Sequence, residues 1–176
     1  HFGTSGREKL ANGISKIAKA VKSTLGPNGQ TVLLESPEHL MGITITKDGV
    51  TVAKSVHLMD PVENLAVQMM RGAADNTASS AGDGTTTSIV IAEAIALSGL
   101  NQLLDTSLNK TNVLNEIYRL SDIVLDTLDS HKIRLTKGKM KHVATISSNN
   151  DKQIGDLITS AYNMVGVNGV VTVENS

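Results

Sequence analysis

One segment of this sequence, residues 85–97, constrains the fold more than any other, because it is apolar on nearly every side of a helix. Its aliphatic residues are Ile89, Val90, Ile91, Ala92, Ala94, Ile95 and Ala96. A helix without a polar face is stable where other helices surround it. The segment therefore predicts a helix in the middle of a bundle, in a mainly α fold with small β elements.

Apolar residues recur at three- and four-residue steps elsewhere in the chain, which predicts further helices. These cover residues 5–25, 64–81, 112–130 and 154–165. The first opens with the spacing of a capping box, Ser5 to Glu8, and the second follows Asp60-Pro61, an N-cap residue with Pro at the first helical position. Aromatic residues make up only 2% of the sequence, so we expect a core of aliphatic side chains.

Short β-rich runs lie between and after the helices. Residues 31–34 and 43–46 predict a pair of strands, and Asp48-Gly49 predicts a turn after the second one. A further strand is predicted over residues 170–173. Lysine and arginine become frequent after His131, where the apolar period stops. This change predicts a domain boundary near His131, followed by a basic segment that is best explained as a solvated surface.

Composition excludes several classes of protein. The chain has 16 basic and 17 acidic residues, so its formal net charge of -1 gives no attraction for nucleic acid. It has no cysteine, which excludes disulfides and thiolate-bound metal, and its five histidines include no i, i+4 pair. No apolar run reaches the roughly 18 residues that span a bilayer, so we expect a soluble protein. Because the chain begins at His1 and stops just after an apolar strand, we expect a piece of a longer protein.

Three glycine-containing turns at element boundaries are the candidate functional residues. They are TLGP at 24–27, KDG at 47–49 and GDGTTT at 82–87. The third precedes the apolar helix, whose free amides and positive dipole end face the turn. Glycines on both sides of Asp83 let a ligand approach the backbone, and the three threonine hydroxyls can donate to phosphate oxygens. An acid fits such a loop if it holds Mg²⁺ beside a nucleotide phosphate.

Each turn also has a purely structural explanation. The third could be a turn in which Asp or Thr caps the next helix, which explains the pattern equally well. The first could be a helix C-cap followed by a turn, and the second a plain hairpin turn. No Walker A pattern occurs in the sequence, so the phosphate site is not of that type.

Taken together, the three turns resemble the N-terminal part of a group I chaperonin subunit, the GroEL/Hsp60 family. The matching motifs extend along essentially the whole chain. They are TLGP (24–27), ITKDGVTVAKS (45–55), AGDGTTT (81–87), ATIS (144–147) and VGVNGVVTVE (165–174). The resemblance implies that residues 1–130 are the N-terminal half of the ATP-binding, ring-forming equatorial domain. Residues 131–176 would be the ascending half of the intermediate hinge domain, while the apical domain and the C-terminal equatorial half would lie outside these residues.

The resemblance implies a role for each turn in binding ATP. The implied nucleotide contacts are Thr24, Leu25, Gly26, Pro27, Lys47, Asp83, Gly84, Thr85, Thr86, Thr87 and Ile146. Asp83 would hold Mg²⁺, and the backbone of Thr24 and Lys47 would hold K⁺. Asp48 would be the catalytic residue that orients the attacking water, and Ile146 would contact the adenine.

The implied function is that of an ATP-dependent molecular chaperone, a chaperonin ATPase that assists protein folding in a ring-shaped chamber. We expect a homo-oligomeric, heptameric ring that binds unfolded polypeptides, and a co-chaperonin, through its apical domains. Neither nucleic acid nor a membrane is an expected partner. The expected location is the cytoplasm, a mitochondrial or plastid matrix, or the host cytoplasm for a virus-encoded protein.

A second function is a chaperonin-like ring-assembly module without efficient ATP hydrolysis. Asn28 and Gln30 favour it, because both stand where the family commonly has basic residues beside the phosphate loop. The intact KDG and DGTTT motifs argue against this second function. A third function, an unrelated phosphotransferase, would need a second phosphate loop that the sequence does not contain.

Overall fold

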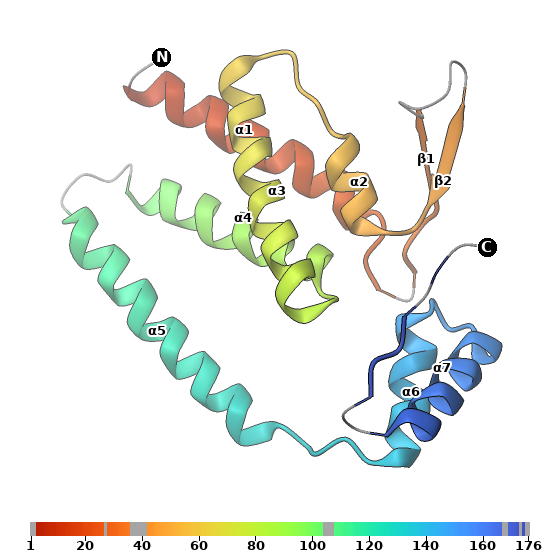
Figure 1. The fold of residues 1–176 in the computed structure, drawn as a ribbon. Helices are drawn as coiled ribbons and strands as arrows, with labels where there is room; N and C mark the ends of the chain where they lie inside the picture. Colours follow the sequence, from red (N-terminus) through yellow and green to blue (C-terminus); the bar gives the residue numbers. More distant parts are fainter. Residues whose placement is uncertain are drawn as a thin grey trace. The chain divides into compact units, whose positions relative to one another are not determined.

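The computed structural model of the chain describes residues 3–26, 28–35, 42–103, 108–166, 169–172 and 174. Its elements are α1 (Gly3–Lys22), β1 (Val32–Glu35), β2 (Ile43–Thr46), α2 (Gly49–Ser55), α3 (Pro61–Ala81), α4 (Thr85–Gln102), α5 (Lys110–His131), α6 (Lys137–Ser147) and α7 (Lys152–Val165) (Figure 1). The predicted mainly α fold with a small β element is confirmed. None of the described helices is both long and apolar enough to cross a membrane.

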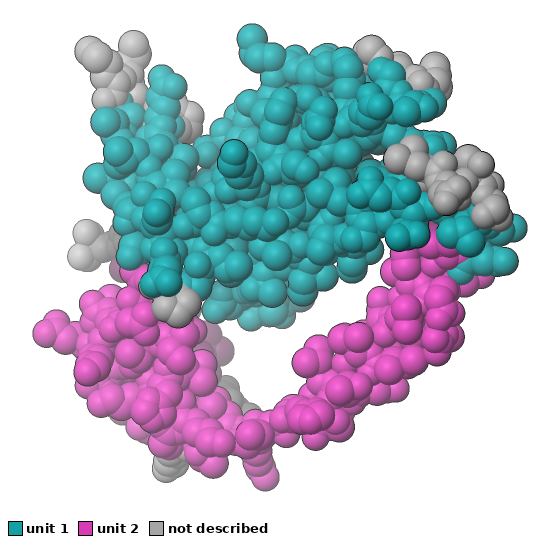
Figure 2. Space-filling view, turned by 180° about the vertical axis from the view of Figure 1, so that it is seen from behind, with its two compact units in different colours: residues 1–112 teal, residues 113–176 magenta. Residues whose placement is uncertain are grey.

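Contacts divide the chain into two compact units, residues 1–112 and residues 113–176 (Figure 2). α5 begins at the end of the first unit and buries none of its side chains. The predicted domain boundary near His131 lies at the other end of that helix. It stays a prediction, because the division into units reflects only contacts among these 176 residues.

The core of the first unit is aliphatic, as the composition requires. Its buried side chains come from α1, α2, α3 and α4, and Ile17, Val21, Val52, Val67 and Ile89 are the largest of those that are fully enclosed. α1 packs against each of the other three helices (Figure 1). This places the C-terminal half of α1 at the centre of the unit.

The prediction of a fully surrounded helix over residues 85–97 was wrong for this chain. α4 buries only Thr85, Ile89 and Glu93, whereas Ile91 and Ile95 are exposed. The reason is geometric: α1, α2 and α3 pack against one side of α4 and leave the other side without a described neighbour.

The N-terminal helix differs from its prediction at both ends. α1 starts at Gly3, so Ser5 lies inside the helix and the expected capping box is not formed. It ends at Lys22, three residues before the predicted Leu25. The hydroxyls of Ser23 and Thr24 donate to carbonyls of the last turn, at 2.7 and 2.8 Å, and so compete with continued helical bonding.

The predicted strand pair is confirmed. β1 and β2 are antiparallel, with Val32 opposite Thr46 and Glu35 opposite Ile43. Alternate residues face the helices: Val32 and Leu34 pack against the core, whereas Leu33 is exposed.

The start of α3 is also confirmed. The Asp60 carboxylate caps the helix by accepting from the Val62 and Glu63 amides, at 2.9 and 3.2 Å. It also forms an ion pair with Lys9 of α1. The hydrogen bond from Lys9, followed by the amide bonds, holds the pKa of Asp60 below its ordinary value. One carboxylate therefore both starts α3 and fastens it to α1.

In the second unit, α6 and α7 form a helical hairpin. Gly155 allows their close approach, because a Cβ at this position would overlap the Thr145 hydroxyl. Asp151 caps α7, accepting from the Gln153 amide at 2.8 Å. α6 continues through Ser147, and residues 148–150 form the turn that joins it to α7.

The strand predicted over residues 170–173 is not observed in its described part. Residues 170–172 form no strand, and Val173 lies outside the described residues. A strand requires a partner for its backbone hydrogen bonds, and the sheet of the described chain consists of β1 and β2 alone.

Candidate functional site

The KDG motif forms the N-terminus of a helix and not a turn after a strand. Asp48 is the N-cap of α2, a seven-residue helix that the sequence analysis did not predict. The Asp-Gly signal for a turn was wrong here, because an aspartate that precedes free amides can cap a helix equally well. Asp48 and Lys47 are exposed, and Gly49 is buried.

The Asp48 carboxylate has a strongly asymmetric set of partners. Its Oδ2 accepts from the Thr51 hydroxyl at 2.6 Å and from the Thr51 amide at 2.9 Å, whereas its Oδ1 accepts only from the Val50 amide at 3.3 Å. Burial raises the pKa of Asp48. The Thr51 hydroxyl, the two amides and the Lys54 charge outweigh burial, so the pKa lies below its ordinary value of 3.8. Asp48 is therefore an ionised hydrogen-bond acceptor at neutral pH.

The turn between α3 and α4 leaves the first amides of α4 without a side-chain cap. Gly82 and Gly84 both adopt left-handed backbone conformations, with φ of 73° and 87°. Gly84 is the N-cap of α4 and offers no side chain to it. Asp83 is exposed, and its Oδ1 accepts from the Gly84 amide at 2.6 Å. Neither an Asp nor a Thr side chain caps α4, so the side-chain cap that the structural explanation expected is not formed.

The segment after α1 forms a closed loop. The Gln30 amide donates to the Ser23 carbonyl at 2.7 Å, and the Gly29 amide donates to the Gly26 carbonyl at 2.9 Å. Gly26 has a φ of 74°. The Thr24 amide and hydroxyl both donate to the Val21 carbonyl, at 3.0 and 2.8 Å. This geometry is that of a helix end followed by a turn, and it ties Thr24 to the buried end of α1.

Two helix starts and one helix end meet where Gly49 lies. A Cβ on Gly49 would overlap the Thr86 hydroxyl and would lie 3.4 Å from Val21 Cγ1. Thr86 belongs to the first turn of α4, and Val21 carries the bonds to Thr24. The starts of α2 and α4 and the end of α1 are therefore adjacent, although they are far apart in the sequence.

Two side chains that the sequence analysis missed tie these helices together. Glu93 of α4 is nearly buried and forms an ion pair with Lys22, the last residue of α1. Arg71 of α3 donates to the carbonyls of Ala53, at 2.8 Å, and of Val56, the C-cap of α2. A charged residue within the apolar run 85–97 was the available signal for Glu93. No sequence signal identified Arg71, since its partners are backbone carbonyls of a helix that was not predicted.

Three predicted site residues make no described contact at the junction. Ile146 lies on α6 in the second unit and is 68% exposed, and Pro27 lies outside the described residues. Lys47 makes no hydrogen bond or ion pair with any residue that the structure describes. Within the same ranges, no group of three or more His, Asp or Glu side chains could hold a metal ion.

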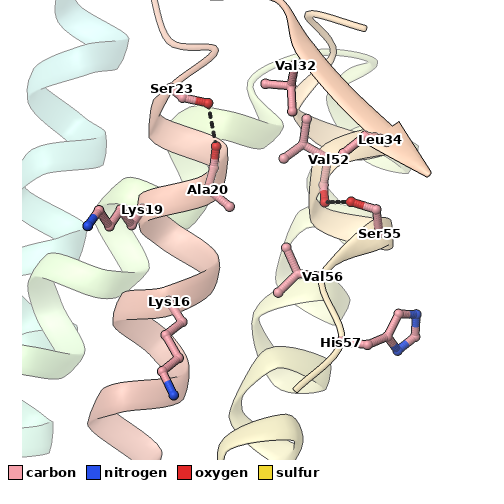
Figure 3. A pocket seen from close by; sticks show the side chains of 10 residues that line it. All are labelled: Lys16, Lys19, Ala20, Ser23, Val32, Leu34, Val52, Ser55, Val56 and His57. Atoms are coloured by element: carbon pink, nitrogen blue, oxygen red, sulfur yellow. Dashed lines mark hydrogen bonds between the residues drawn. The ribbon is translucent and has the colours of Figure 1, made fainter. Parts of the chain in front are cut away.

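A cavity of about 530 Å³ opens between α1, α2 and β1 (Figure 3). Its apolar side includes Ala20, Val32 and Val52. The hydroxyls of Ser23 and Ser55 donate to the carbonyls of Ala20 in α1 and Val52 in α2 (Figure 3). None of the described residues that were predicted to contact ATP lines it. The cavity is therefore not lined by the described residues of the candidate site.

The donors and acceptors at the junction fit a nucleotide phosphate with Mg²⁺. Uncapped amides at the start of α4 and the hydroxyls of Thr86 and Thr87 are donors for phosphate oxygens. The Asp83 carboxylate is exposed and is of the ligand type that Mg²⁺ prefers. Gly84, with its positive φ, leaves the backbone open to close approach.

Comparison with known proteins identifies the family. Residues 17–175 match the model of the TCP-1/cpn60 chaperonin family. The chain is 41% identical to chaperonin GroEL 1 of Rhodopirellula baltica over 180 residues, which cover 98% of this chain and 30% of that protein. It therefore spans about a third of the length of this relative.

Solved structures agree with this relationship. The chaperonin gp146 of Pseudomonas aeruginosa bacteriophage EL 2, crystallised in the presence of ATP-BeFx, has a TM-score of 0.76 and 31% identity, over 91% of this chain and 28% of its own. A group III chaperonin in the open state has a TM-score of 0.74 at 24% identity, over 91% of this chain and 32% of its own, and shows the same fold. The chain belongs to the TCP-1/cpn60 chaperonin family.

Proposed function

We propose that this chain contributes half of a Mg²⁺-dependent ATPase site to a chaperonin subunit, which uses ATP to assist protein folding. The proposal rests on one observation above all: Gly49 places the starts of α2 and α4 and the end of α1 side by side. The KDG and GDGTTT turns meet there, and the TLGP turn follows the end of α1. Family membership supports the same function.

In this proposal, the turn before α4 receives the triphosphate. The amides and hydroxyls of Thr85, Thr86 and Thr87 bind phosphate oxygens, and Gly84 permits their close approach. Asp83 holds Mg²⁺, which when bound neutralises charge on the phosphates. Residues of the first turn, including Leu25, Gly26 and Pro27, line the nucleotide, and Ile146 contacts the adenine when the nucleotide is enclosed.

Lys47 and Asp48 act on the other side of the phosphates. The Lys47 ammonium, without a described partner, balances phosphate charge. Carbonyl oxygens of Thr24 and Lys47 provide ligands for K⁺. Asp48 is ionised and exposed, so it accepts a hydrogen bond from the attacking water and orients it.

The proposed assembly is a homo-oligomeric ring, heptameric and acting in the cytoplasm. Residues 1–130 would belong to its equatorial domain and residues 131–176 to the intermediate hinge domain. Segments beyond this chain would bind unfolded polypeptide and a co-chaperonin. Their contribution agrees with the chain covering 30% of its curated relative.

The test is an ATPase assay of the full-length protein together with its particle mass from light scattering. We expect a particle of ring size that hydrolyses ATP only with Mg²⁺. A ring that does not hydrolyse ATP would instead support the ring-assembly module favoured by Asn28 and Gln30. A monomer without ATPase activity would contradict both functions.

A further inference from the structure

The two carboxylate oxygens of Asp48 differ in the number of hydrogen bonds that they accept. A carboxylate oxygen has two lone pairs, and both on Oδ2 are used, by the Thr51 hydroxyl at 2.6 Å and the Thr51 amide at 2.9 Å. Oδ1 receives one long bond from the Val50 amide, at 3.3 Å. Oδ1 is therefore the oxygen that can accept from a further donor.

The Thr51 hydroxyl is the contact that selects this orientation. The last side-chain torsion of aspartate is soft, so a carboxylate held only by backbone amides can turn about it. Short O–H···O⁻ bonds to a charged acceptor are about twice as strong as bonds between neutral groups. The bond at 2.6 Å is the shortest of the three on Asp48, and it comes from the first turn of the helix that Asp48 caps.

We propose that Thr51 is a positioning residue that locks Oδ2 of Asp48 and so leaves Oδ1 to orient the attacking water. The proposal rests on the proposed ATPase function and adds a residue outside the contacts implied by the KDG turn itself. In this proposal Thr51 makes no contact of its own with nucleotide or water. It acts through Asp48, on the step in which the water is aligned.

Two substitutions at position 51 separate the hydroxyl from the rest of the side chain. Thr51→Val keeps the branched shape and removes the hydroxyl, whereas Thr51→Ser keeps the hydroxyl and removes the methyl group. The Thr51 amide still bonds Oδ2 in both variants, so the cap of α2 is retained. Ser55→Ala is the matched control, because the Ser55 hydroxyl donates at 2.8 Å to the Val52 carbonyl of the same helix (Figure 3). This hydroxyl is not among the three described donors to Asp48.

The experiment measures kcat, KM for ATP and the single-turnover hydrolysis rate in the full-length assembled protein. In Thr51→Val, we expect kcat and the single-turnover rate to fall about tenfold, with KM within about twofold of the unaltered protein. Thr51→Ser and Ser55→Ala should keep the rate. A role confined to capping would lower thermal stability without changing single-turnover chemistry.

Each other outcome contradicts a specific statement. If the unaltered protein does not hydrolyse ATP, the proposed function fails. If it hydrolyses ATP and Thr51→Val does so equally fast, only the role of Thr51 fails. If Thr51→Val does not assemble, Thr51→Ala replaces it, and failure of both would overturn the proposal because Thr51 would then be needed for folding instead of for water alignment.

Discussion

The backbone of Gly49 lies directly against the hydroxyl of Thr86, so closely that a Cβ at position 49 would overlap Thr86 Oγ1. This contact joins the first turn of α2 to the first turn of α4. Gly49 is buried and Thr86 is partly buried. Asp48 precedes Gly49, and Asp83 lies three residues before Thr86. The contact therefore fixes the positions of the two helix starts that carry the acidic residues of the site.

Gly49→Ala should damage both the fold and the site. The added methyl group must displace Thr86 or α2, at a cost of about 1–3 kcal/mol for an overpacked contact. We expect weaker ATP binding by calorimetry and faster hydrogen exchange in α2 of the full-length protein. Gly72→Ala is the control, because a Cβ at this helical position meets nothing within 4 Å. Equal exchange and binding in the two variants would show that the Gly49 contact is unimportant.

The ion pair between Lys22 and Glu93 should matter for the local stability of α1 and α4. Lys22→Met leaves the nearly buried Glu93 without its partner, which costs about 1–3 kcal/mol. Hydrogen exchange at the end of α1 should become faster by the corresponding factor. Adding Glu93→Met should restore much of the protection, since no buried charge then remains. Unchanged hydrogen exchange in the Lys22→Met variant would contradict the structural role of the pair.

The Asp60 cap predicts a specific dependence of stability on pH. Its pKa is lowered in the folded state, so its contribution is complete above the unfolded pKa and is lost as pH falls through the folded pKa, below about pH 4. Asp60→Asn should lower the melting temperature at neutral pH and leave it unchanged in strong acid. Asp126→Asn, on exposed α5 and without an ion pair among described residues, is the control. Parallel melting curves at all pH values would refute the linkage.

The hairpin of α6 and α7 provides a separate test in the second unit. Gly155→Ala should push the helices apart, because its Cβ would overlap the Thr145 hydroxyl and lie 2.9 Å from Thr145 Cα. We expect a loss of about 1–3 kcal/mol of local stability, read from hydrogen exchange in α7. At Gly138 of α6 a Cβ meets nothing, so Gly138→Ala should be neutral or stabilising. A larger loss of local stability in Gly138→Ala than in Gly155→Ala would contradict the described packing of α6 against α7.

Local signals in the sequence predicted much of the fold. The start of α3 was predicted correctly because Asp60 caps it through bonds to the next few residues, and such local chemistry is visible in sequence. The β1–β2 pair was predicted from its two β-rich runs, which are also local signals. The short helix α2 was missed, since seven residues carry too little periodicity and Asp48 matched a turn equally well. The end of α1 was set by the hydroxyls of Ser23 and Thr24, which the apolar stripe did not reveal.

Long-range packing accounts for what the sequence did not show. The candidate turns could be named from their glycines and threonines, but their meeting at Gly49 depends on how α1, α2 and α4 pack. The partners of Thr51, Arg71 and Glu93 likewise depend on the observed start and end of α2 and on helix contacts. The all-round hydrophobicity of α4 predicted more burial than the 176 residues provide, as exposed Ile91 and Ile95 show.

Calorimetric titration of the full-length protein with ATP, with and without Mg²⁺, tests the proposed site most directly. The variants are Asp83→Ala and Asp48→Ala, whose side chains occupy the two helix starts that meet at Gly49. We predict that Asp83→Ala loses Mg²⁺-dependent binding, whereas Asp48→Ala binds Mg²⁺ and ATP normally and loses most of its turnover. Normal Mg²⁺-dependent binding by Asp83→Ala would contradict the metal assignment, and unchanged turnover by Asp48→Ala would remove that residue from the mechanism.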